Sequence, residues 1–201
     1  MGDVNVGAIA EFEELQKRVE FYEKHKQDLE QAIDNLKKVI NSINKESRKL
    51  FREIFDQVNE NFKKVIPKLF EGGKGELILT DEQDLLESGM EIVIQPMGKR
   101  LQNINLLSGG EKALSAIALL ISVFMVKPSP FALLDEIDAP LDDASVGKLN
   151  NIIKELSTKS QFLLITHNKR SIEIADVIYG ITMEEPGVSK IISMKLQKEA
   201  V

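Results

Sequence analysis

The 201-residue sequence is 43% apolar and 29% charged, enough for one buried core but short for two independent domains of ordinary size. Its formal net charge of −6 argues against a wholly basic nucleic-acid binder, because nonspecific DNA affinity comes from Lys and Arg that neutralise phosphates. It has no cysteine, which excludes disulfides and thiolate metal sites, and we find no signal peptide or membrane-length apolar run. We therefore expect a cytoplasmic chain with no membrane partner.

The first third of the chain has the periodicity of a coiled coil. From Phe12 to Ile54 the apolar positions advance by alternating steps of three and four, broken only at Lys26 and Ser47, and no proline or glycine interrupts them. Such a seam needs a second helix to cover it, from another chain or from sequence outside this one. We predict a coiled-coil arm over residues 1–54.

Near Leu50 the apolar stripe slips by one residue and continues on a rotated face of the same helix, through Phe51, Phe55, Val58, Phe62, Val65 and Leu69. A change of phase turns the buried face, so we expect the helix to join a globular part, residues 55–201, at this point. Pro67 and the glycine-rich turn 72–75 are expected to close the helix.

Beyond the helix, strands and helices alternate. Two strands are predicted at 76–80 and 91–95, and they are followed by helices at 111–126, 144–156 and 169–175 and by strands at 131–134, 161–165, 177–183 and 190–195. Alternating helix and apolar strand is typical of an α/β sheet, whose ligand site lies at the carboxyl ends of its parallel strands.

A glycine-rich motif, LSGGEKAL at residues 107–114, precedes the first of these later helices. Ser108 and Glu111 have the spacing of an ordinary capping box, which is the structural alternative. However, Gly109 and Gly110 disfavour the first helical turn and remove side chains where backbone N–H groups point outward. The motif therefore suits a helix N-terminus that an anion approaches closely.

Three further motifs end or follow the apolar strands. Asp135 and Glu136 close strand 131–134, where one carboxylate could hold Mg²⁺ and the next could orient a water that attacks a phosphate. Asp142 has the position of a helix N-cap, and His167 ends the strand 161–165, where it could contact a γ-phosphate or the attacking water. Each also has a plain structural reading when taken alone.

In their order and spacing these motifs resemble the C-terminal half of an ABC-type ATPase head, specifically that of the structural maintenance of chromosomes (SMC) family. The resemblance rests on LSGGEKAL, on PFALLDEIDAPLDD at 130–143, on QFLLITHNK at 161–169, on YGITM and GVSK near the end, and on VNVGAIAEFEEL at 4–15. It implies an α/β fold, the C-terminal lobe of an ABC-type P-loop ATPase head with a protruding coiled-coil helix. The lack of added segments around these motifs favours a prokaryotic origin by analogy with the family.

The sequence lacks the phosphate-binding loop G-x-x-x-x-G-K-[ST]. Without that loop there is no nest of N–H groups and no lysine for the β- and γ-phosphates. The resemblance implies that an N-terminal SMC head segment supplies this Walker A loop. We therefore predict that this chain alone neither binds ATP tightly nor hydrolyses it.

The resemblance also implies ATP and Mg²⁺ as cofactors and a role for each motif. Asp135 would coordinate Mg²⁺ through water, Glu136 would activate the hydrolytic water, and His167 would lie near the γ-phosphate as a second catalytic residue.

On the other side of a head-to-head sandwich dimer, Ser108 with the amides of Gly109 and Gly110 would engage ATP held by a second SMC head, and Asp142 would meet the same interface. Further implied partners are DNA and a kleisin subunit, through its C-terminal winged-helix domain. The implied function is ATP-driven chromosome organisation, condensation and segregation by a nucleoid-associated protein.

Two alternatives stay open. The chain could belong to a related coiled-coil DNA double-strand-break repair ATPase, against which the LDEIDAPLDD and GVSK segments argue. It could also be a structural coiled-coil interaction module whose ATPase motifs are vestigial, in which case a properly folded complete complex would show no ATP turnover.

Overall fold

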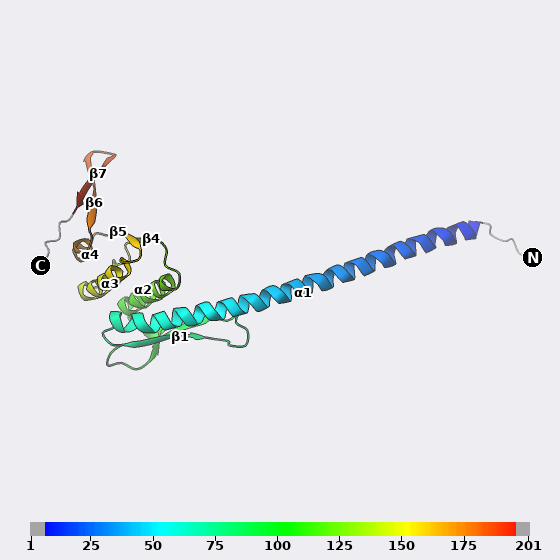
Figure 1. Ribbon diagram of the computed structural model, residues 1–201, viewed down its shortest axis with the longest axis horizontal. Coiled ribbons are helices and arrows are strands. Elements are labelled where there is room, and N and C mark those ends of the chain that lie inside the picture. The colour runs from blue at the N-terminus through cyan, green and yellow to red at the C-terminus, as the bar shows by residue number, and fades with distance from the viewer. Residues whose placement is uncertain (1–6, 196–201) are drawn as a thin grey trace, which may run out of the picture. The chain divides into compact units, whose positions relative to one another are not determined.

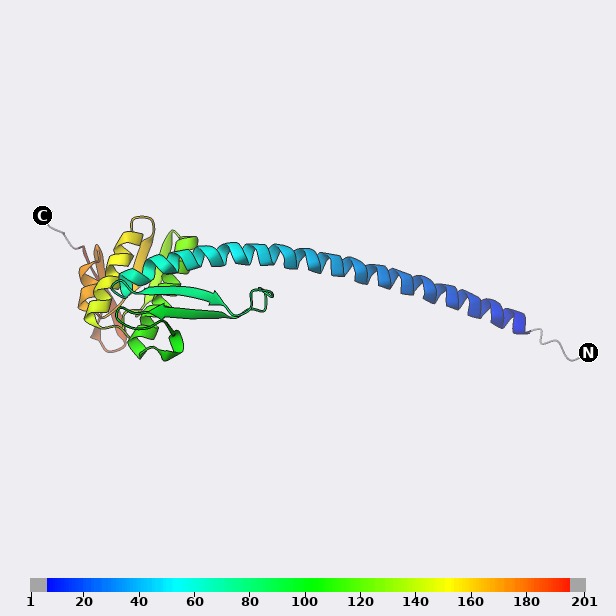
Figure 2. The ribbon, with the colours of Figure 1, turned by 90° about the horizontal axis from the view of Figure 1, so that it is seen from below.

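The computed structural model describes residues 7–195, except for the side chain of Ala8, and the chain divides into two compact units between Phe51 and Arg52. One helix, α1 (Gly7–Leu69), begins in the first unit and ends in the second, as Figures 1 and 2 show. In the first unit the predicted seam is exposed, at Phe12, Leu15, Val19, Tyr22, Leu29, Ile33, Leu36, Ile40, Ile43 and Leu50.

The rotated stripe of α1 lies in the core of the second unit, as the phase slip predicts. Val58, Phe62, Val65 and Leu69 are buried, whereas Phe51, the first residue of the stripe, remains exposed. A stripe buried at this depth stabilises the unit by roughly 1.5–3 kcal/mol for each large side chain removed from water.

The end of α1 corrects the prediction for Pro67. This residue lies inside the helix, in its last turn, and does not end it. The helix is closed instead by a Schellman-type turn, in which the amide of Gly72 donates to the carbonyl of Pro67 at 2.9 Å and Glu71 adopts a positive φ of 54°.

A three-stranded antiparallel sheet follows α1 and consists of β1 (Lys74–Leu79), β2 (Met90–Gln95) and β3 (Gln102–Asn103). The side chain of Asn59 on α1 fastens this sheet, since it accepts from the amide of Leu77 at 2.9 Å and donates to the carbonyl of Leu77 at 3.2 Å. Neither β3 nor the short 3-10 helix η1 (Ile104–Leu106) was predicted, because two or three residues show no periodicity.

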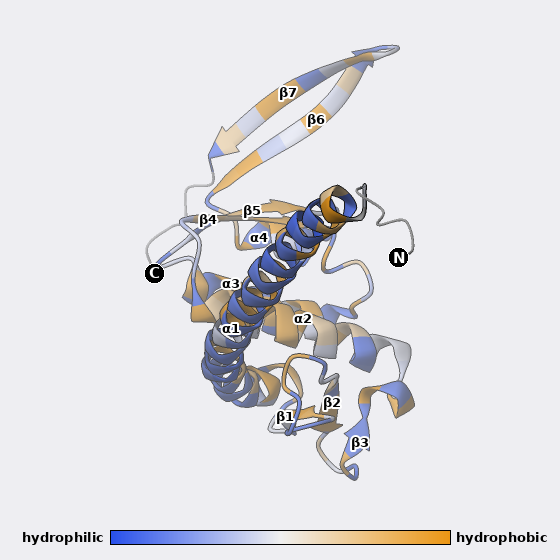
Figure 3. Ribbon diagram, turned by 90° about the vertical axis from the view of Figure 1, so that its right-hand side faces the viewer, coloured by the Kyte–Doolittle hydropathy of each residue, from blue (hydrophilic) through white to orange (hydrophobic). Residues whose placement is uncertain are grey.

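The helical layer of the second unit contains α2 (Gly109–Val126), α3 (Asp143–Leu156) and the short α4 (Lys169–Glu173). α2 is long and apolar enough to cross a membrane by length and composition alone, which the sequence analysis overlooked. However, its residues Leu114, Ile117, Ala118 and Ile121 are buried in the same core as the end of α1 and α3, as in the core helix of a globular protein. Figure 3 shows the apolar colouring of α2 beside the more polar α1.

Two short strands carry the parallel part of the fold, β4 (Phe131–Asp135) and β5 (Gln161–Ile165), joined through α3. The late strands β6 (Val177–Glu185) and β7 (Val188–Lys195) do not extend this pair but form a separate antiparallel hairpin. The single α/β sheet expected from the sequence is therefore a two-stranded parallel pair within residues 7–195.

Candidate functional site

The acidic residues lie at the carboxyl end of β4. Asp135 is its last residue and pairs with Ile165, the last residue of β5. Glu136 follows with a positive φ of 47°, a conformation that costs a non-glycine residue of order 1 kcal/mol, and its amide donates to the carbonyl of Ile165 at 2.9 Å. Both carboxylates are exposed, and this backbone bond holds Glu136 at the strand edge.

His167 is brought to the same edge by the parallel register. Because Asp135 is opposite Ile165, the segments that follow the two strands begin side by side. His167 is exposed, and it is followed by Asn168, which caps α4 by accepting from the amide of Arg170 at 2.9 Å. The fold thus places Asp135, Glu136 and His167 at one end of the parallel pair.

Asp138 is a buried residue of this edge that the sequence analysis did not select. The residue is 6% exposed, and its Oδ2 accepts from the hydroxyls of Thr166, at 2.6 Å, and Ser171. In the stretch Asp135-Glu136-Ile137-Asp138 the first two acids were selected because their position suggests a chemical role. Asp138 was not selected, because its burial depends on residues that are distant in the sequence.

Asp142 is the N-cap of α3, the structural role that its position predicts. Its carboxylate accepts from the amide of Ser145 at 2.7 Å, and hydrogen bonding from Ser145 lowers the pKa of Asp142. The side chain stays exposed, so its free edge is open to a partner.

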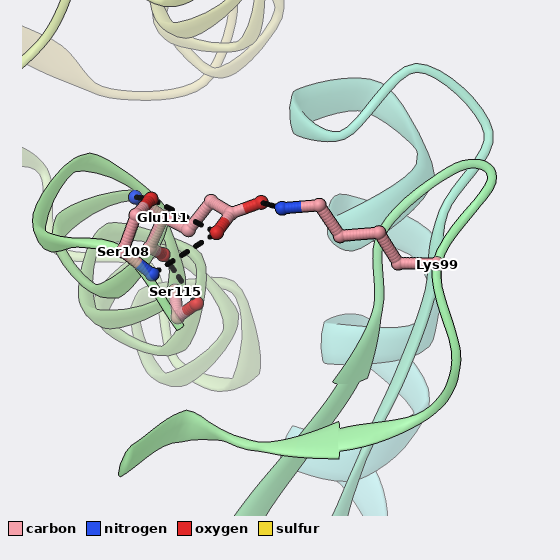
Figure 4. Close-up of polar contacts among 4 residues, drawn as sticks. All are labelled: Lys99, Ser108, Glu111 and Ser115. Atoms are coloured by element: carbon pink, nitrogen blue, oxygen red, sulfur yellow. Dashed lines mark hydrogen bonds and ion pairs between the residues drawn. The ribbon is translucent and has the colours of Figure 1, made fainter. Parts of the chain in front are cut away.

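The glycine-rich motif begins α2 with a complete capping box (Figure 4). Ser108 accepts from the amide of Glu111 at 3.4 Å, and the Glu111 carboxylate accepts from the amide and hydroxyl of Ser108 at 3.1 and 2.9 Å. Lys99, in the loop between β2 and β3, donates to the other Glu111 oxygen at 2.7 Å. The hydrogen bond from Lys99 and those from Ser108 together lower the pKa of Glu111 to about 2.

Gly109 and Gly110 have no evident structural need to be glycine. Neither has a positive φ, and a Cβ added to either would meet nothing within 4 Å. Among the residues that the structure describes, the amides of Gly109 and Gly110 also have no hydrogen-bond acceptor. This helix start therefore offers two outward N–H groups on a surface that another molecule can approach closely.

A magnesium ion could find only a partial protein site here. Within residues 7–195 there is no group of three or more His, Asp or Glu side chains that could hold a metal. Mg²⁺ in nucleotide sites keeps several waters and takes one or two carboxylates together with phosphate oxygens. The single exposed carboxylate of Asp135 fits that donor set and would not hold the ion by itself.

The fold is the α/β fold of ABC-type ATPase heads, since structurally similar solved proteins are SMC ATPase heads. Residues 8–190 match the family described as "RecF/RecN/SMC N terminal domain", and the chain belongs to this family. The chain is 52% identical over 198 residues to a curated relative named "Chromosome partition protein Smc" from Myxococcus xanthus (strain DK1622). This match covers 98% of the chain but 16% of the relative, so the chain spans a small part of that protein.

Solved SMC head structures share the fold. One, from work on ATP-driven dimerization and DNA-stimulated activation of SMC ATPases, is 40% identical with a TM-score of 0.69, and the match covers 74% of this chain and 89% of that one. Another, an Smc head domain with an extended coiled coil bound to the C-terminal domain of ScpA, derived from Pyrococcus furiosus, is 38% identical with a TM-score of 0.71. That match covers 94% of this chain and 47% of the other.

These likenesses confirm the predicted fold class and the SMC relationship of the chain. The individual roles of Asp135, Glu136, His167, Ser108 and Asp142 stay predictions, because the geometry shows where these side chains lie and not what they bind.

Proposed function

We propose that this chain is the C-terminal half of a prokaryotic SMC ATPase head with a stub of its coiled-coil arm. An N-terminal head segment that carries the Walker A loop would complete it. Two such heads would hold ATP and Mg²⁺ between them and hydrolyse the ATP, and the resulting joining and release of heads would drive chromosome organisation, condensation and segregation.

The observation that carries this proposal is that one apolar face of the parallel β4–β5 pair is exposed. Phe131, Leu133, Leu163 and Ile165 on one face of the β4–β5 pair are 47–70% exposed, while the alternate residues pack against the core. Parallel strands are normally covered on both faces. The exposed apolar face beside the acidic edge is therefore evidence for a further layer of structure that covers it. A second head segment would provide such a layer.

At the completed site each side chain would have one task. ATP would supply the phosphate that is transferred to water, and Mg²⁺ would neutralise its charge. Asp135 would hold the ion through water, Glu136 would orient and accept a proton from the attacking water, and His167 would hydrogen-bond the terminal phosphate. The backbone bond from the Glu136 amide to the Ile165 carbonyl would hold the main chain of this base in place before the substrate arrives.

Across the dimer, the same phosphate would be met by the start of α2. The two unoccupied amides of Gly109 and Gly110 point outward, and the Ser108 hydroxyl would turn from Glu111 towards the incoming oxygen. Asp142 would meet the opposing head through its exposed edge.

The proposed partners follow from the relatives. One similar head is bound to the C-terminal domain of ScpA, and another comes from work on DNA-stimulated activation of SMC ATPases. We propose that this chain likewise takes the C-terminal winged-helix domain of a kleisin and acts on DNA in the cytoplasm, at the nucleoid. The chromosome-partition name of its relative favours this function over double-strand-break repair.

The test is to co-express the chain with the Walker A segment of its own protein and to measure ATP turnover and head joining. We expect Glu136→Gln to retain ATP binding, to slow hydrolysis by about 100-fold or more, and to accumulate joined heads. Glu173→Gln, a change at an exposed acid of α4, is the matched control and should turn over ATP normally.

Either of two results would contradict the proposal. No turnover by the folded wild-type complex would support the vestigial interaction module, and rapid turnover by Glu136→Gln would remove this residue from its role.

A further inference from the structure

Asp138 is a buried carboxylate between the two segments that carry Glu136 and His167, and the proposed mechanism gives it no task. We infer that Asp138 is a positioning residue that holds the His167 segment in place against Glu136. This inference rests on the proposed ATPase function.

The contacts of Asp138 join the two strand ends. Its Oδ2 accepts from the Thr166 hydroxyl at 2.6 Å, directly before His167, and from the hydroxyl of Ser171 on α4. Asp138 is 6% exposed and Ser171 is 4% exposed. A carboxylate buried to this extent must be hydrogen-bonded, because an unsatisfied charge in the interior costs several kcal/mol. The two hydroxyls are therefore held to it firmly.

On the acidic side, Asp138 belongs to the same short turn as Glu136. The amide of Ala139 donates to the Glu136 carbonyl at 3.1 Å, and the amide of Leu141 donates to the Asp138 carbonyl at 3.1 Å. With the Glu136 amide bound to Ile165, these bonds leave the turn little freedom to move relative to β5.

On the histidine side, the segment is held at both ends. The Thr166 hydroxyl, while donating to Asp138, accepts from the amide of Asn168 at 2.9 Å, so His167 lies within a closed turn. Ser171 ties the helix that follows to the same carboxylate oxygen. An outer contact joins the two helices that follow these segments, since the Arg170 guanidinium of α4 donates to the carbonyl of Asp143, the first residue of α3, at 3.1 Å.

The consequence for catalysis is geometric. A displacement of about 1 Å of a catalytic group can cost about 100-fold in rate, and the distance between Glu136 and His167 depends on the contacts that Asp138 makes. Because the two hydroxyl partners of Asp138 lie on both flanks of His167, loss of the carboxylate would release the histidine segment on both sides.

The first measurement uses the chain as it stands. In Asp138→Ala we expect backbone amides of residues 166–171 to exchange hydrogen at least about tenfold faster, while those of β1 and β2 are unchanged. Ser160→Ala is the matched control, since Ser160 also has a buried hydroxyl but one with no hydrogen-bond partner among residues 7–195. Ser171→Ala gives a milder loosening of the same segment if Asp138→Ala folds poorly.

The second measurement uses the head completed with its Walker A segment. Asp138→Ala should lower kcat by about 10- to 100-fold with KM changed less than about twofold, because the acting residues are misplaced while ATP binding is kept. Asp138→Asn, which retains an oxygen that accepts from both hydroxyls, should recover most of the rate. In a His167→Ala background, Asp138→Ala should cause little further loss, since it acts through the histidine segment.

Two results would overturn the inference, and a third would overturn the proposed function on which its catalytic consequence rests. Unchanged exchange at 166–171 in Asp138→Ala would show that the carboxylate does not hold the segment, whatever the ATPase activity. An equal loss of kcat from Asp138→Ala in wild type and in the His167→Ala background would show that Asp138 does not act through the histidine segment. No turnover by the wild-type complex would overturn the proposed function and with it the catalytic consequence, while the exchange result would still decide whether Asp138 holds the segment.

Discussion

Two apolar stripes on α1 differ completely in their surroundings. The apolar residues of the seam that ends at Ile54 are all exposed, whereas the stripe from Val58 to Leu69 is buried with residues of β1, β2, α2 and α3. Both stripes consist of similar residues at similar spacing. The comparison shows that periodicity specifies which face of a helix is to be buried, and that burial itself requires a neighbour that the chain must supply or recruit.

The parallel strands repeat this contrast across their two faces. Leu134 and Leu164 pack against the core, while Leu133 and Leu163 are exposed. The exposed face of β4 and β5 thus resembles the seam of α1, in that each presents apolar side chains at a regular spacing without cover.

The strongest contrast in stability is expected between the two stripes of α1. Phe62→Ala should lower the free energy of unfolding by about 3–5 kcal/mol, because Phe62 is fully buried, whereas Phe12→Ala should change it by less than about 0.5 kcal/mol. Urea unfolding of the two variants would measure the difference. A large loss of unfolding free energy in Phe12→Ala would show that a second helix already covers the seam in solution.

The next effect separates the two faces of β4. Leu133→Ser should leave the stability of this chain within about 1 kcal/mol of wild type, yet weaken its binding to the Walker A segment by about 10-fold or more through lost apolar burial. Leu134→Ser, one residue away on the packed face, should instead destabilise the chain itself. Titration of the two halves by fluorescence anisotropy, together with thermal unfolding, would test the contrast, and unaltered binding by Leu133→Ser would contradict the covering role.

A smaller change in unfolding free energy is expected at the start of α2, where the capping box of Ser108 and Glu111 and the ion pair with Lys99 hold the helix cap. Glu111→Gln should cost about 1 kcal/mol of unfolding free energy at pH 7, because it loses the Lys99 pair and weakens the capping box. Glu155→Gln, which removes the exposed pair of Lys68 and Glu155, is the control and should cost less than about 0.5 kcal/mol.

This contribution should also depend on pH in a defined direction. Folding lowers the pKa of Glu111 from 4.5 to about 2, so the folded state favours the charged carboxylate. The stabilisation is therefore fully present above pH 4.5 and is lost as the pH falls towards 2. Urea unfolding of wild type and Glu111→Gln between pH 7 and about pH 3 should show the difference between their unfolding free energies becoming smaller. A constant difference would contradict the lowered pKa of Glu111.

Much of the site was predictable because its signals are local. The caps at Ser108 and Asp142 depend on residues three positions away, and the order of the strands that carry Asp135 and His167 follows from alternating patterns. The error at Pro67 is also local, because the bond that closes the helix runs from the Gly72 amide to the Pro67 carbonyl, so the glycine-rich turn ends the helix and the proline does not.

Local patterns were enough to predict the heptad seam, the slip of its phase, the helix starts and the acidic strand end, since each is encoded by neighbours within one or two turns or along one strand. Three features became visible only in the folded chain: Asp138 is buried against Thr166, 28 residues away, Lys99 reaches Glu111, and one face of β4 and β5 is exposed. Those features arise where distant segments meet, and the energy of a buried charge or an uncovered face depends on the whole set of groups around it.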